Sequence, residues 1–411
     1  MGGDRHTHDT RGQVRGTVSG LWQPAGMRFL HTSDWHLGRA FHQVGLLDAQ
    51  RAYLDHLVEV VRSEGVDAVL VSGDVYDRAM PGPETVELLS DTLVRLVDAG
   101  AEVVISSGNH DSAVRLGFAA DLLERSGVHL RTSLADLARP VLIEDCAIYP
   151  LPYLEPRLVA DALEAEATHA GVLRSALERL PPRGLVPGVT TSVVMAHTFV
   201  TGCATSDSER DILSGGLSAV HPDVLTGFSY VALGHLHGRQ QVSETAHYSG
   251  SPVAMSFSEV NHAKVSLLVD LSSAGAVIEA IAAPVERPLA ALRGTIDGLL
   301  TSSEFTHAEG AWCQITLTDP VRPRAAMDRL RTRFPGALEL KFDPSGAAPV
   351  RHTYASRTAA RTDLDVCCDF LSHVRGGPAA TTAERTLLDE ALGRSRESRG
   401  LRDDEGQVGA A

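Results

Sequence analysis

Five short polar clusters each follow an apolar run of the chain, and they contain the side-chain types that bind divalent metals. They are SDWHLG at 33–38, SGDVYD at 72–77, GNHD at 108–111, AHT at 196–198 and GHLHG at 234–238. In Asp-x-His and His-x-His, an extended backbone turns alternate side chains to the same side, so each pair can reach one cation or two neighbouring ones. Imidazole, carboxylate and amide groups suit Mn, Fe, Zn or similar ions, and the lack of a thiolate excludes a structural zinc set.

The candidate ligands are too many for one ion and suit two ions that share a carboxylate. They are Asp34, His36, Asp74, Asn109, His197, His235 and His237. Asp74 is the natural bridge because it stands alone between the two groups that carry histidines. A glycine precedes a ligand at Gly73, Gly108 and Gly234, where a backbone without a side chain permits a sharp exit from a strand.

Each cluster alone also has a structural interpretation. Asp34 and His36 could form a helix cap with a solvated histidine, His197 could be a core histidine, and GHLHG could be a turn. Asp74 and Asp77 could be turn-forming residues. The ordered recurrence of all five clusters at the ends of apolar runs favours the metal site.

Alternating strand and helix patterns surround the first three clusters. The spacing predicts strands at 27–33, 67–74 and 101–111, and amphipathic helices at 46–65 and 82–100 that end at glycines. This alternation predicts a substantially parallel sheet covered by helices, with its carboxyl ends along one edge, where such folds bind ligands. The distant clusters are therefore expected to converge there.

The rest of the chain predicts further strands, a smaller module and two helices. Strands or strand ends are expected at 191–198, 228–238 and 264–271. A break near AAPVERPL begins an α+β module with strands at 312–319 and 337–342 around a helix at 323–334. Two helices are expected at 363–376 and 381–398, whereas residues 1–26 and the charged end are expected to be disordered. Met27 could be the true start.

Composition indicates a globular protein without a membrane anchor. The chain has 411 residues, 43% hydrophobic and 22% charged, and no apolar stretch approaches the length that spans a bilayer. A cytoplasmic protein is expected, with its five cysteines as ordinary thiols because none form a Cys-x-x-Cys pair. The net charge of −15 opposes binding to polyanions, so binding of nucleic acid would need metal ions or a basic partner.

The motifs resemble those of the calcineurin-type metallophosphoesterase superfamily. FLHTSDWHLGR, SGDVYD, GNHDS and GHLHG together resemble one branch, that of SbcD, the nuclease subunit of the bacterial SbcCD complex. The resemblance covers the chain from Met27 to about residue 395. It implies a core of layered β-sheets flanked by helices, a smaller α+β capping domain and C-terminal helices. The implied domains are a nuclease domain at 27–283, a capping domain at 284–358, a partner-binding helical segment at 359–396 and a disordered tail at 397–411, after the extension at 1–26.

The resemblance also implies a role for each site residue. It assigns Asp34, His36 and His237 to a first metal, with Asp74 as the bridge. It assigns the second metal to Asn109, His197 and His235. Manganese is the implied cation. His110 matches the family's catalytic histidine, whose ring Asp111 would orient. The role of Asp77 stays open, because archaeal and eukaryotic relatives have histidine there, whereas bacterial members tend to have aspartate.

The implied activity is a 3′–5′ exonuclease on duplex DNA and an endonuclease on hairpins and single strands, in DNA repair, recombination and replication. The implied partners are DNA and the coiled-coil ATPase SbcC, with a homodimer of the nuclease inside a heterotetramer. No membrane is involved, and the complex would act at the nucleoid. Two alternatives remain. The first is a phosphomonoesterase or cyclic-nucleotide phosphodiesterase with the same metal site, and the second is a scaffold for the ATPase.

Overall fold

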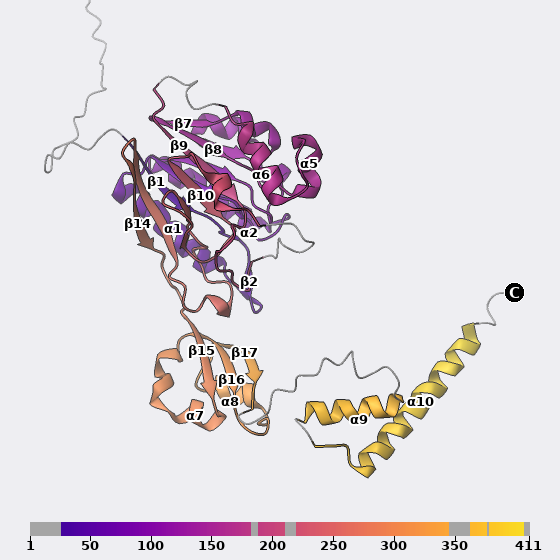
Figure 1. Cartoon of the computed structure of the whole chain (residues 1–411). Coiled ribbons are helices and arrows are strands. Elements are labelled where there is room, and N and C mark those ends of the chain that lie inside the picture. The colour runs from indigo at the N-terminus through magenta and orange to yellow at the C-terminus, as the bar shows by residue number, and fades with distance from the viewer. Residues whose placement is uncertain (1–25, 182–187, 210–218, 345–361, 376–377, 407–411) are drawn as a thin grey trace, which may run out of the picture. The chain divides into compact units, whose positions relative to one another are not determined.

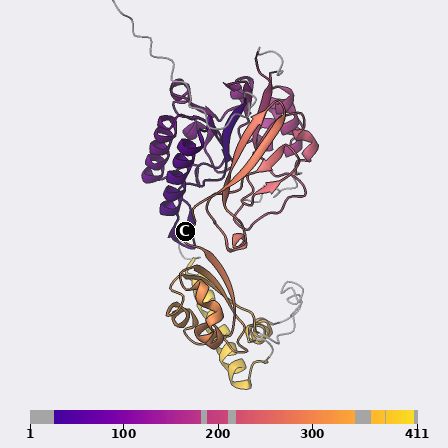
Figure 2. The same ribbon diagram turned by 90° about the vertical axis from the view of Figure 1, so that its left-hand side faces the viewer.

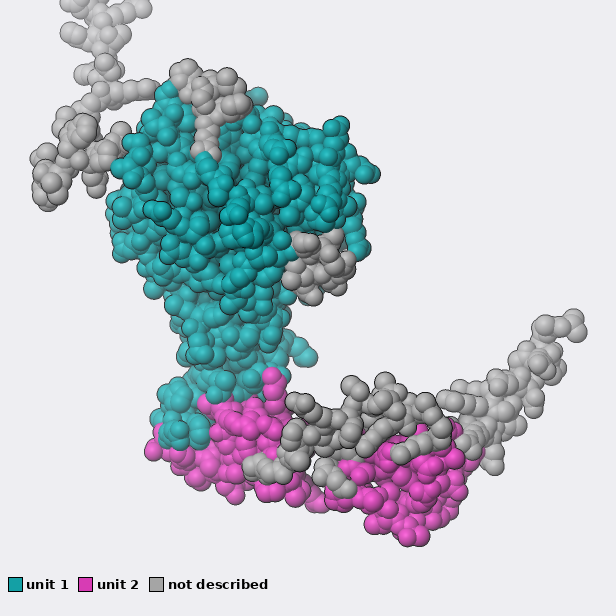
Figure 3. Space-filling view, in the orientation of Figure 1, with its two compact units in different colours: residues 1–291, 304–314, 334–339 teal, residues 292–303, 315–333, 340–411 magenta. Residues whose placement is uncertain are grey.

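The structure, a computed structural model, describes residues 26–181, 188–209, 219–344, 362–375 and 378–406. The predicted extension at 1–26 therefore lies almost wholly outside the described residues. The chain divides into two compact units, coloured separately in Figure 3. The first comprises residues 1–291, 304–314 and 334–339, and the second comprises 292–303, 315–333 and 340–411.

The described part of the first unit contains two mixed six-stranded sheets (Figure 1). The first sheet has the order β14-β13-β1-β4-β5-β6, formed by β1 (Met27–Thr32), β4 (Ala68–Ser72), β5 (Glu102–Ser106), β6 (Val128–Arg131), β13 (Val265–Ser272) and β14 (Gly275–Ala282). The second has the order β11-β12-β10-β9-β8-β7, formed by β7 (Val141–Ile143), β8 (Cys146–Pro150), β9 (Thr191–His197), β10 (Tyr230–Gly234), β11 (Gln240–Gln241) and β12 (Ala246–Tyr248).

The two sheets face each other across one apolar core, and helices cover their outer faces (Figure 2). The continuous apolar runs produce this layering because alternate residues of a strand point to opposite faces. Phe29 and Leu70 enter the core between the sheets, whereas Leu30 and Val69 pack under the helices of the first sheet. Burial of every residue of β4 holds the end of that strand in place.

The helices follow the sequence patterns closely. α1 (Leu47–Glu64) ends where Gly65 adopts the left-handed conformation with a φ of 63°, and α2 (Pro83–Asp98) begins with proline in its first turn. Both pack on the first sheet through apolar residues three and four positions apart. The second sheet is covered by α5 (Pro156–Leu163) and α6 (His169–Glu178).

The first unit also contains shorter elements. Among them are the hairpin β2 (Ala40–Phe41) and β3 (Val44–Gly45), and the single-turn helices α3 (Ala113–Leu116) and α4 (Ala120–Leu123). The expectation of a parallel sheet is correct for β1, β4, β5 and β6, but β13 and β14 run antiparallel to their neighbours. The short turn between β13 and β14 explains the direction of β14 relative to β13, because such a turn joins only antiparallel strands.

A separate three-stranded sheet forms the expected α+β module. Its order is β15-β16-β17, with β15 (Leu289–Gly294), β16 (Trp312–Leu317) and β17 (Ala337–Phe342). α7 (Ile296–Thr301) and α8 (Ala326–Arg331) contact each other, and Arg329 donates a hydrogen bond of 3.0 Å to Asp297. Leu299 and Leu330 are fully buried, so the module has an apolar interior.

Two helices near the end of the chain contact each other, α9 (Asp363–Val374) and α10 (Thr382–Gly406). Arg375 forms two hydrogen bonds with Glu384, and Arg385 forms one with Asp365. α10 continues past residue 396, where the sequence predicts a disordered tail, to Gly406. The segment 394–405 contains no proline that would end the helix.

The layered sheets flanked by helices, with the smaller module and the C-terminal helices, confirm the predicted fold class. Helices of the described segments include none with the length and apolar character that a transmembrane span requires.

Candidate metal centre

The predicted ligands meet at the carboxyl ends of strands from both sheets. The loops after β1, β4 and β5 bring them from the first sheet, and β9 and β10 bring them from the second. Asp34, His36, Asp74 and His235 all have positive φ values, of 54°, 44°, 48° and 105°. Such a backbone is unfavourable for residues with a side chain and is typical of functional sites, where packing holds the strain in place.

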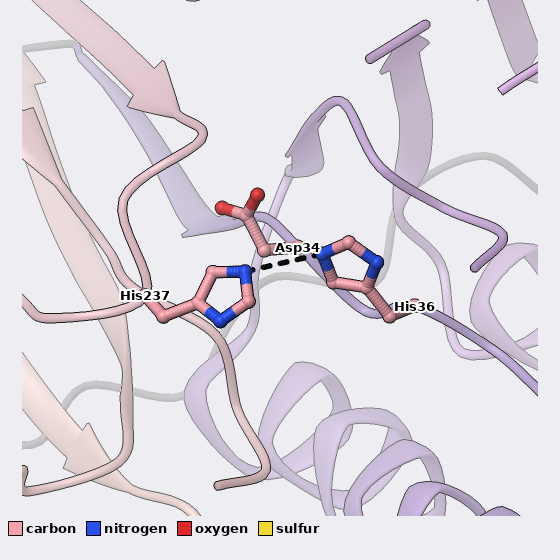
Figure 4. Close-up of side chains that lie close together, drawn as sticks. All are labelled: Asp34, His36 and His237. Carbon is pink, nitrogen blue, oxygen red and sulfur yellow. Dashed lines mark hydrogen bonds between the residues drawn. The ribbon is translucent and has the colours of Figure 1, made fainter. Parts of the chain in front are cut away.

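Asp34, His36 and His237 form one compact group (Figure 4). Each is at most 2% exposed, and one ligand atom from each lies within 4.8 Å of the others. The Nε2 atoms of the two histidines face each other at 3.1 Å. Two neutral imidazoles can make this contact as an N–H···N hydrogen bond, and with both lone pairs turned inward the same spacing suits a shared cation.

Asp74 lies between this group and the next histidine. Its Oδ2 is 3.5 Å from His36 Nε2 and 3.4 Å from His197 Nε2. Its other oxygen accepts a hydrogen bond of 2.8 Å from the backbone N–H of His110. One carboxylate oxygen therefore faces two imidazoles that come from different sheets.

The remaining predicted ligands are His197, Asn109 and His235. His197 Nε2 lies 2.9 Å from Asn109 Oδ1, and the His197 and His235 rings are 5.3 Å apart. The backbone N–H of His235 donates to both carboxylate oxygens of Asp34, each at 3.1 Å. These bonds tie the strand end that carries His235 to the first group.

Hydrogen bonds behind the histidines aim their Nε2 atoms inward. His197 Nδ1 lies 3.0 Å from the carbonyl oxygen of Ser72, and His237 Nδ1 lies 2.7 Å from Ser208 Oγ. A carbonyl oxygen only accepts, so in the neutral ring of His197 the proton lies on Nδ1 and Nε2 is the lone-pair donor.

A buried ionic network continues behind His237. Ser208 Oγ donates to Glu259, and the Lys264 ammonium contacts the same carboxylate, the His237 carbonyl oxygen and Ser251. The backbone N–H of His237 donates to Glu209 at 2.7 Å. Sequence analysis missed Ser208, Glu209, Glu259 and Lys264, because no local motif marks them and the fold alone brings them to His237.

The structure corrects the role predicted for Asp111. Its carboxylate accepts three backbone hydrogen bonds, from the N–H groups of Val75, Tyr76 and Gly108, at 2.9 to 3.1 Å. The Nδ1 of His110 instead lies 2.8 Å from the backbone carbonyl oxygen of Asp77. Asp111 therefore ties two metal-site loops together, because its position three residues after Gly108 turns it back onto the loop backbone.

Burial and charge shift the pKa values in opposite directions across the centre. Burial would raise the pKa of Asp74, but the surrounding imidazoles, above all His197, hold it well below its usual value. Burial would lower the pKa of His197, yet the Asp74 charge raises it to about 9. Burial, aided by the His197 charge, holds the pKa of His235 well below its usual value. Burial and the nearby Asp74 raise the pKa of Asp111 to about 6.

Glycine leaves space for the ligands at two close approaches. A Cβ on Gly108 would lie 2.2 Å from both the amide nitrogen and Oδ1 of Asp74. A Cβ on Gly73, which has a φ of 82°, would lie 2.3 Å from His197 Nδ1. Any larger residue would displace Asp74 or His197.

The donor set fits divalent cations. Converging imidazole nitrogens, carboxylate oxygens and an amide oxygen, held by outer hydrogen bonds, form the mixed N/O environment that such ions prefer. All seven predicted ligands belong to this one neighbourhood of the first unit.

Comparison with known proteins identifies the family. Residues 27–239 match the calcineurin-like phosphoesterase model, and the chain belongs to that family. Residues 285–375 match the model SbcD_C, described as the type 5 capsule protein repressor C-terminal domain. The SbcD component of the nuclease SbcCD from Staphylococcus saprophyticus is 28% identical over 319 residues, which cover 76% of this chain and 84% of that protein. These matches confirm the resemblance to SbcD.

Solved structures give weaker matches. A dimetal phosphatase from Danio rerio is 14% identical, with a TM-score of 0.36, and the match covers 64% of this chain and all of that one. A protein of Thermus thermophilus is 11% identical with a TM-score of 0.34, covering 62% of this chain and 99% of that one.

Proposed function

We propose that this chain is the nuclease subunit of an SbcCD-type complex, a manganese-dependent enzyme that hydrolyses DNA phosphodiesters. It would act as a 3′–5′ exonuclease on duplex DNA and as an endonuclease on hairpins and single strands. The observation that carries the proposal is the position of Asp74, whose Oδ2 faces His36 and His197 at 3.5 and 3.4 Å. A carboxylate so placed can bridge two ions.

The ligands divide into two groups around this bridge. Asp34, His36 and His237 would hold the first ion, and Asn109, His197 and His235 the second. A pair of ions at this place supplies clamps for the nonbridging oxygens of a phosphodiester and a water of lowered pKa. The chain contributes the fixed orientation of each imidazole and the loops that hold Asp74.

His110 has the position of a group that acts on the reacting phosphate. Its Nδ1 is held by the Asp77 carbonyl oxygen, and its Nε2 lies 4.0 Å from Asp74 Oδ2. The ring is thereby held with Nε2 toward the site that the two ions would occupy. There it would stabilise the charge that develops on the phosphate or protonate the leaving 3′ oxygen.

The acidic charge of the chain supports a partner that contributes DNA affinity. A net charge of −15 gives little attraction to a polyanion, so we assign much of the duplex binding to the ATPase SbcC. The α9–α10 pair supports the docking of that partner, because it exposes Phe370, Val374 and Leu387 by 54%, 64% and 65%. The module at 284–358 would cap the DNA site, in a homodimer inside a heterotetramer that works in the cytoplasm at the nucleoid.

Digestion of labelled DNA tests the activity. With manganese, end-labelled duplex should be shortened from its 3′ ends and a hairpin should be opened, both faster when SbcC and ATP are present. Cyclic nucleotides and phosphomonoesters should be poor substrates. Preferential cleavage of a cyclic nucleotide or a monoester, with DNA left intact, would replace the nuclease proposal with the alternative phosphoesterase.

Co-purification tests the partner surface. Removal of residues from 362 onward should abolish co-purification with SbcC and spare hydrolysis of a small phosphodiester. Within the full chain, Leu387→Glu should weaken the complex at least tenfold, because a buried charge opposes an apolar interface. Val321→Glu is the matched control, since Val321 is 79% exposed outside the helical pair. An equal loss of SbcC binding in both variants would contradict the assignment of the α9–α10 pair as the docking surface.

A further inference from the structure

Arg39, in the HLGR segment after His36, holds two separate parts of the metal centre at once. Its Nη1 donates a hydrogen bond of 3.0 Å to Asp77 Oδ1. Its Nη2 donates one of 3.0 Å to the backbone carbonyl oxygen of Ser208. The side chain is only 18% exposed, so these bonds are partly shielded from water.

The hydrogen bond to Asp77 connects Arg39 with His36. Asp77 Oδ1, which accepts from Arg39, lies 3.6 Å from His36 Nδ1, and the Asp77 side chain is 13% exposed. Within the described residues, His36 Nδ1 is buried without a hydrogen-bond partner. Asp77 is therefore the acceptor placed behind the ring whose Nε2 faces the first metal position.

The hydrogen bond to Ser208 connects Arg39 with His237. Ser208, whose carbonyl oxygen accepts from Arg39, places its own Oγ 2.7 Å from His237 Nδ1. The same hydroxyl donates to the buried Glu259. Fixing the backbone of Ser208 thus fixes the hydroxyl that sets the orientation of the His237 ring.

We propose that Arg39 is a positioning residue that aligns His36 and His237 with each other for the first metal ion, acting through Asp77 on one side and Ser208 on the other. This inference rests on the proposed function, because it takes both histidines as ligands. It also assigns a role to Asp77, whose carboxylate lies 3.6 Å from His36 Nδ1 and whose carbonyl oxygen lies 2.8 Å from His110 Nδ1.

The planar guanidinium explains why this position needs arginine. Its two terminal nitrogens diverge at a fixed angle and serve acceptors from two loops at the same time. A lysine keeps the charge but offers a single point donor.

The test compares Arg39→Lys with Arg95→Lys in manganese titrations by calorimetry. Arg95 is the matched control, because it also bonds two acceptors, Asp55 and Asp91. Arg39→Lys should weaken one of the two manganese sites by roughly 10- to 100-fold and leave the unfolding temperature of the metal-free protein unchanged. Arg95→Lys should bind both ions as the wild type does.

Variants at Asp77 and Ser208 test the two connections of Arg39 separately. Asp77→Asn keeps the carbonyl bond to His110 and should weaken the same manganese site as Arg39→Lys. In the double variant of Arg39→Lys with Asp77→Asn, the loss of manganese affinity should be smaller than the sum of the two single losses. Both changes interrupt the same connection, from Arg39 through Asp77 to His36. Ser208→Ala should weaken this site through His237.

Two results would overturn the inference. One is wild-type manganese affinity in Arg39→Lys, with a raised KM for DNA, which would make Arg39 a substrate-binding residue. The other is equal weakening of both sites together with a lowered unfolding temperature of the metal-free protein. Failure of the proposed function looks different. If the metal centre is wrong, the wild-type chain binds no manganese pair, and if only the nuclease activity is wrong, the wild type binds both ions but cleaves a cyclic nucleotide or a monoester instead of DNA.

Discussion

The Nδ1 atom of His110 lies 2.8 Å from the backbone carbonyl oxygen of Asp77, and this contact sets the direction of the imidazole. The acceptor belongs to the main chain, so the ring is held whatever side chain stands at residue 77. The Asp77 carboxylate is left free for His36 and Arg39. One residue thereby connects the histidine proposed for catalysis with a proposed metal ligand.

His110→Ala should abolish DNA cleavage and leave manganese binding nearly unchanged. The ring is proposed to act on the phosphate, whereas its backbone N–H, which the variant retains, is the group that bonds Asp74. We expect a fall in rate of roughly a hundredfold to ten-thousandfold, the usual contribution of a general acid. Manganese content is measured in parallel, and its loss together with activity would make His110 a ligand instead.

Manganese affinity should rise with pH between about 7 and 9, because a metal ligand must be deprotonated. The Asp74 charge overcomes burial and raises the pKa of His197 to about 9, so His197 carries a proton near neutral pH in the metal-free protein. Binding must then release this proton, and affinity should fall by about tenfold for each pH unit below the pKa. Calorimetry in two buffers of different ionisation enthalpy measures the release. Equal binding enthalpies in both buffers would contradict this account.

Gly108→Ala should disrupt the bridge without replacing any proposed ligand. The added Cβ would lie 2.2 Å from the Asp74 amide nitrogen and Oδ1, so the carboxylate must shift. We expect manganese affinity to fall by about tenfold or more, as when a ligand is misoriented. Gly310→Ala is the control, because the described structure has no atom within 4 Å of its Cβ. Unchanged affinity in Gly108→Ala would show that Asp74 does not depend on this loop.

Lys264→Met should destabilise the metal-free protein by about 3 to 5 kcal/mol, because it leaves Glu259 buried without its cation. Both side chains of this pair are at most 5% exposed. Arg95→Met breaks a pair in which Arg95 is 32% exposed, and should cost less than about 1 kcal/mol. Urea unfolding followed by the fluorescence of buried Trp35 gives both values. Adding Glu259→Leu to Lys264→Met should restore most of the stability, and a further loss would contradict the explanation.

The helix and strands at the centre of the first sheet could be predicted well, because apolar spacing and helix-ending glycines are features of the local sequence. Apolar spacing and Gly65 predict α1 within one residue at each end, and the buried runs predict β1, β4 and β5. Two- and three-residue strands such as β11 and β7 carry too little pattern to be recognised. Their positions depend on pairing with neighbours that are distant in sequence.

The candidate ligands could be predicted for a similar reason, whereas their supporting contacts could not. Each ligand lies at the end of a strand or within a few residues after it, and strand direction brings these ends together. Ser208 and Glu259 meet His237 only through tertiary packing, so no spacing indicates them. The error over Asp111 has the same origin, since adjacency to His110 in the chain did not bring its carboxylate to the ring.

Diffraction at the manganese absorption edge, from crystals grown with excess manganese, tests the central claim most directly. The account predicts two anomalous peaks about 3.5 to 4 Å apart, one on each side of the Asp74 carboxylate. The first should contact His36 and His237, and the second His197 and His235. A single peak, or none in this pocket, would contradict it.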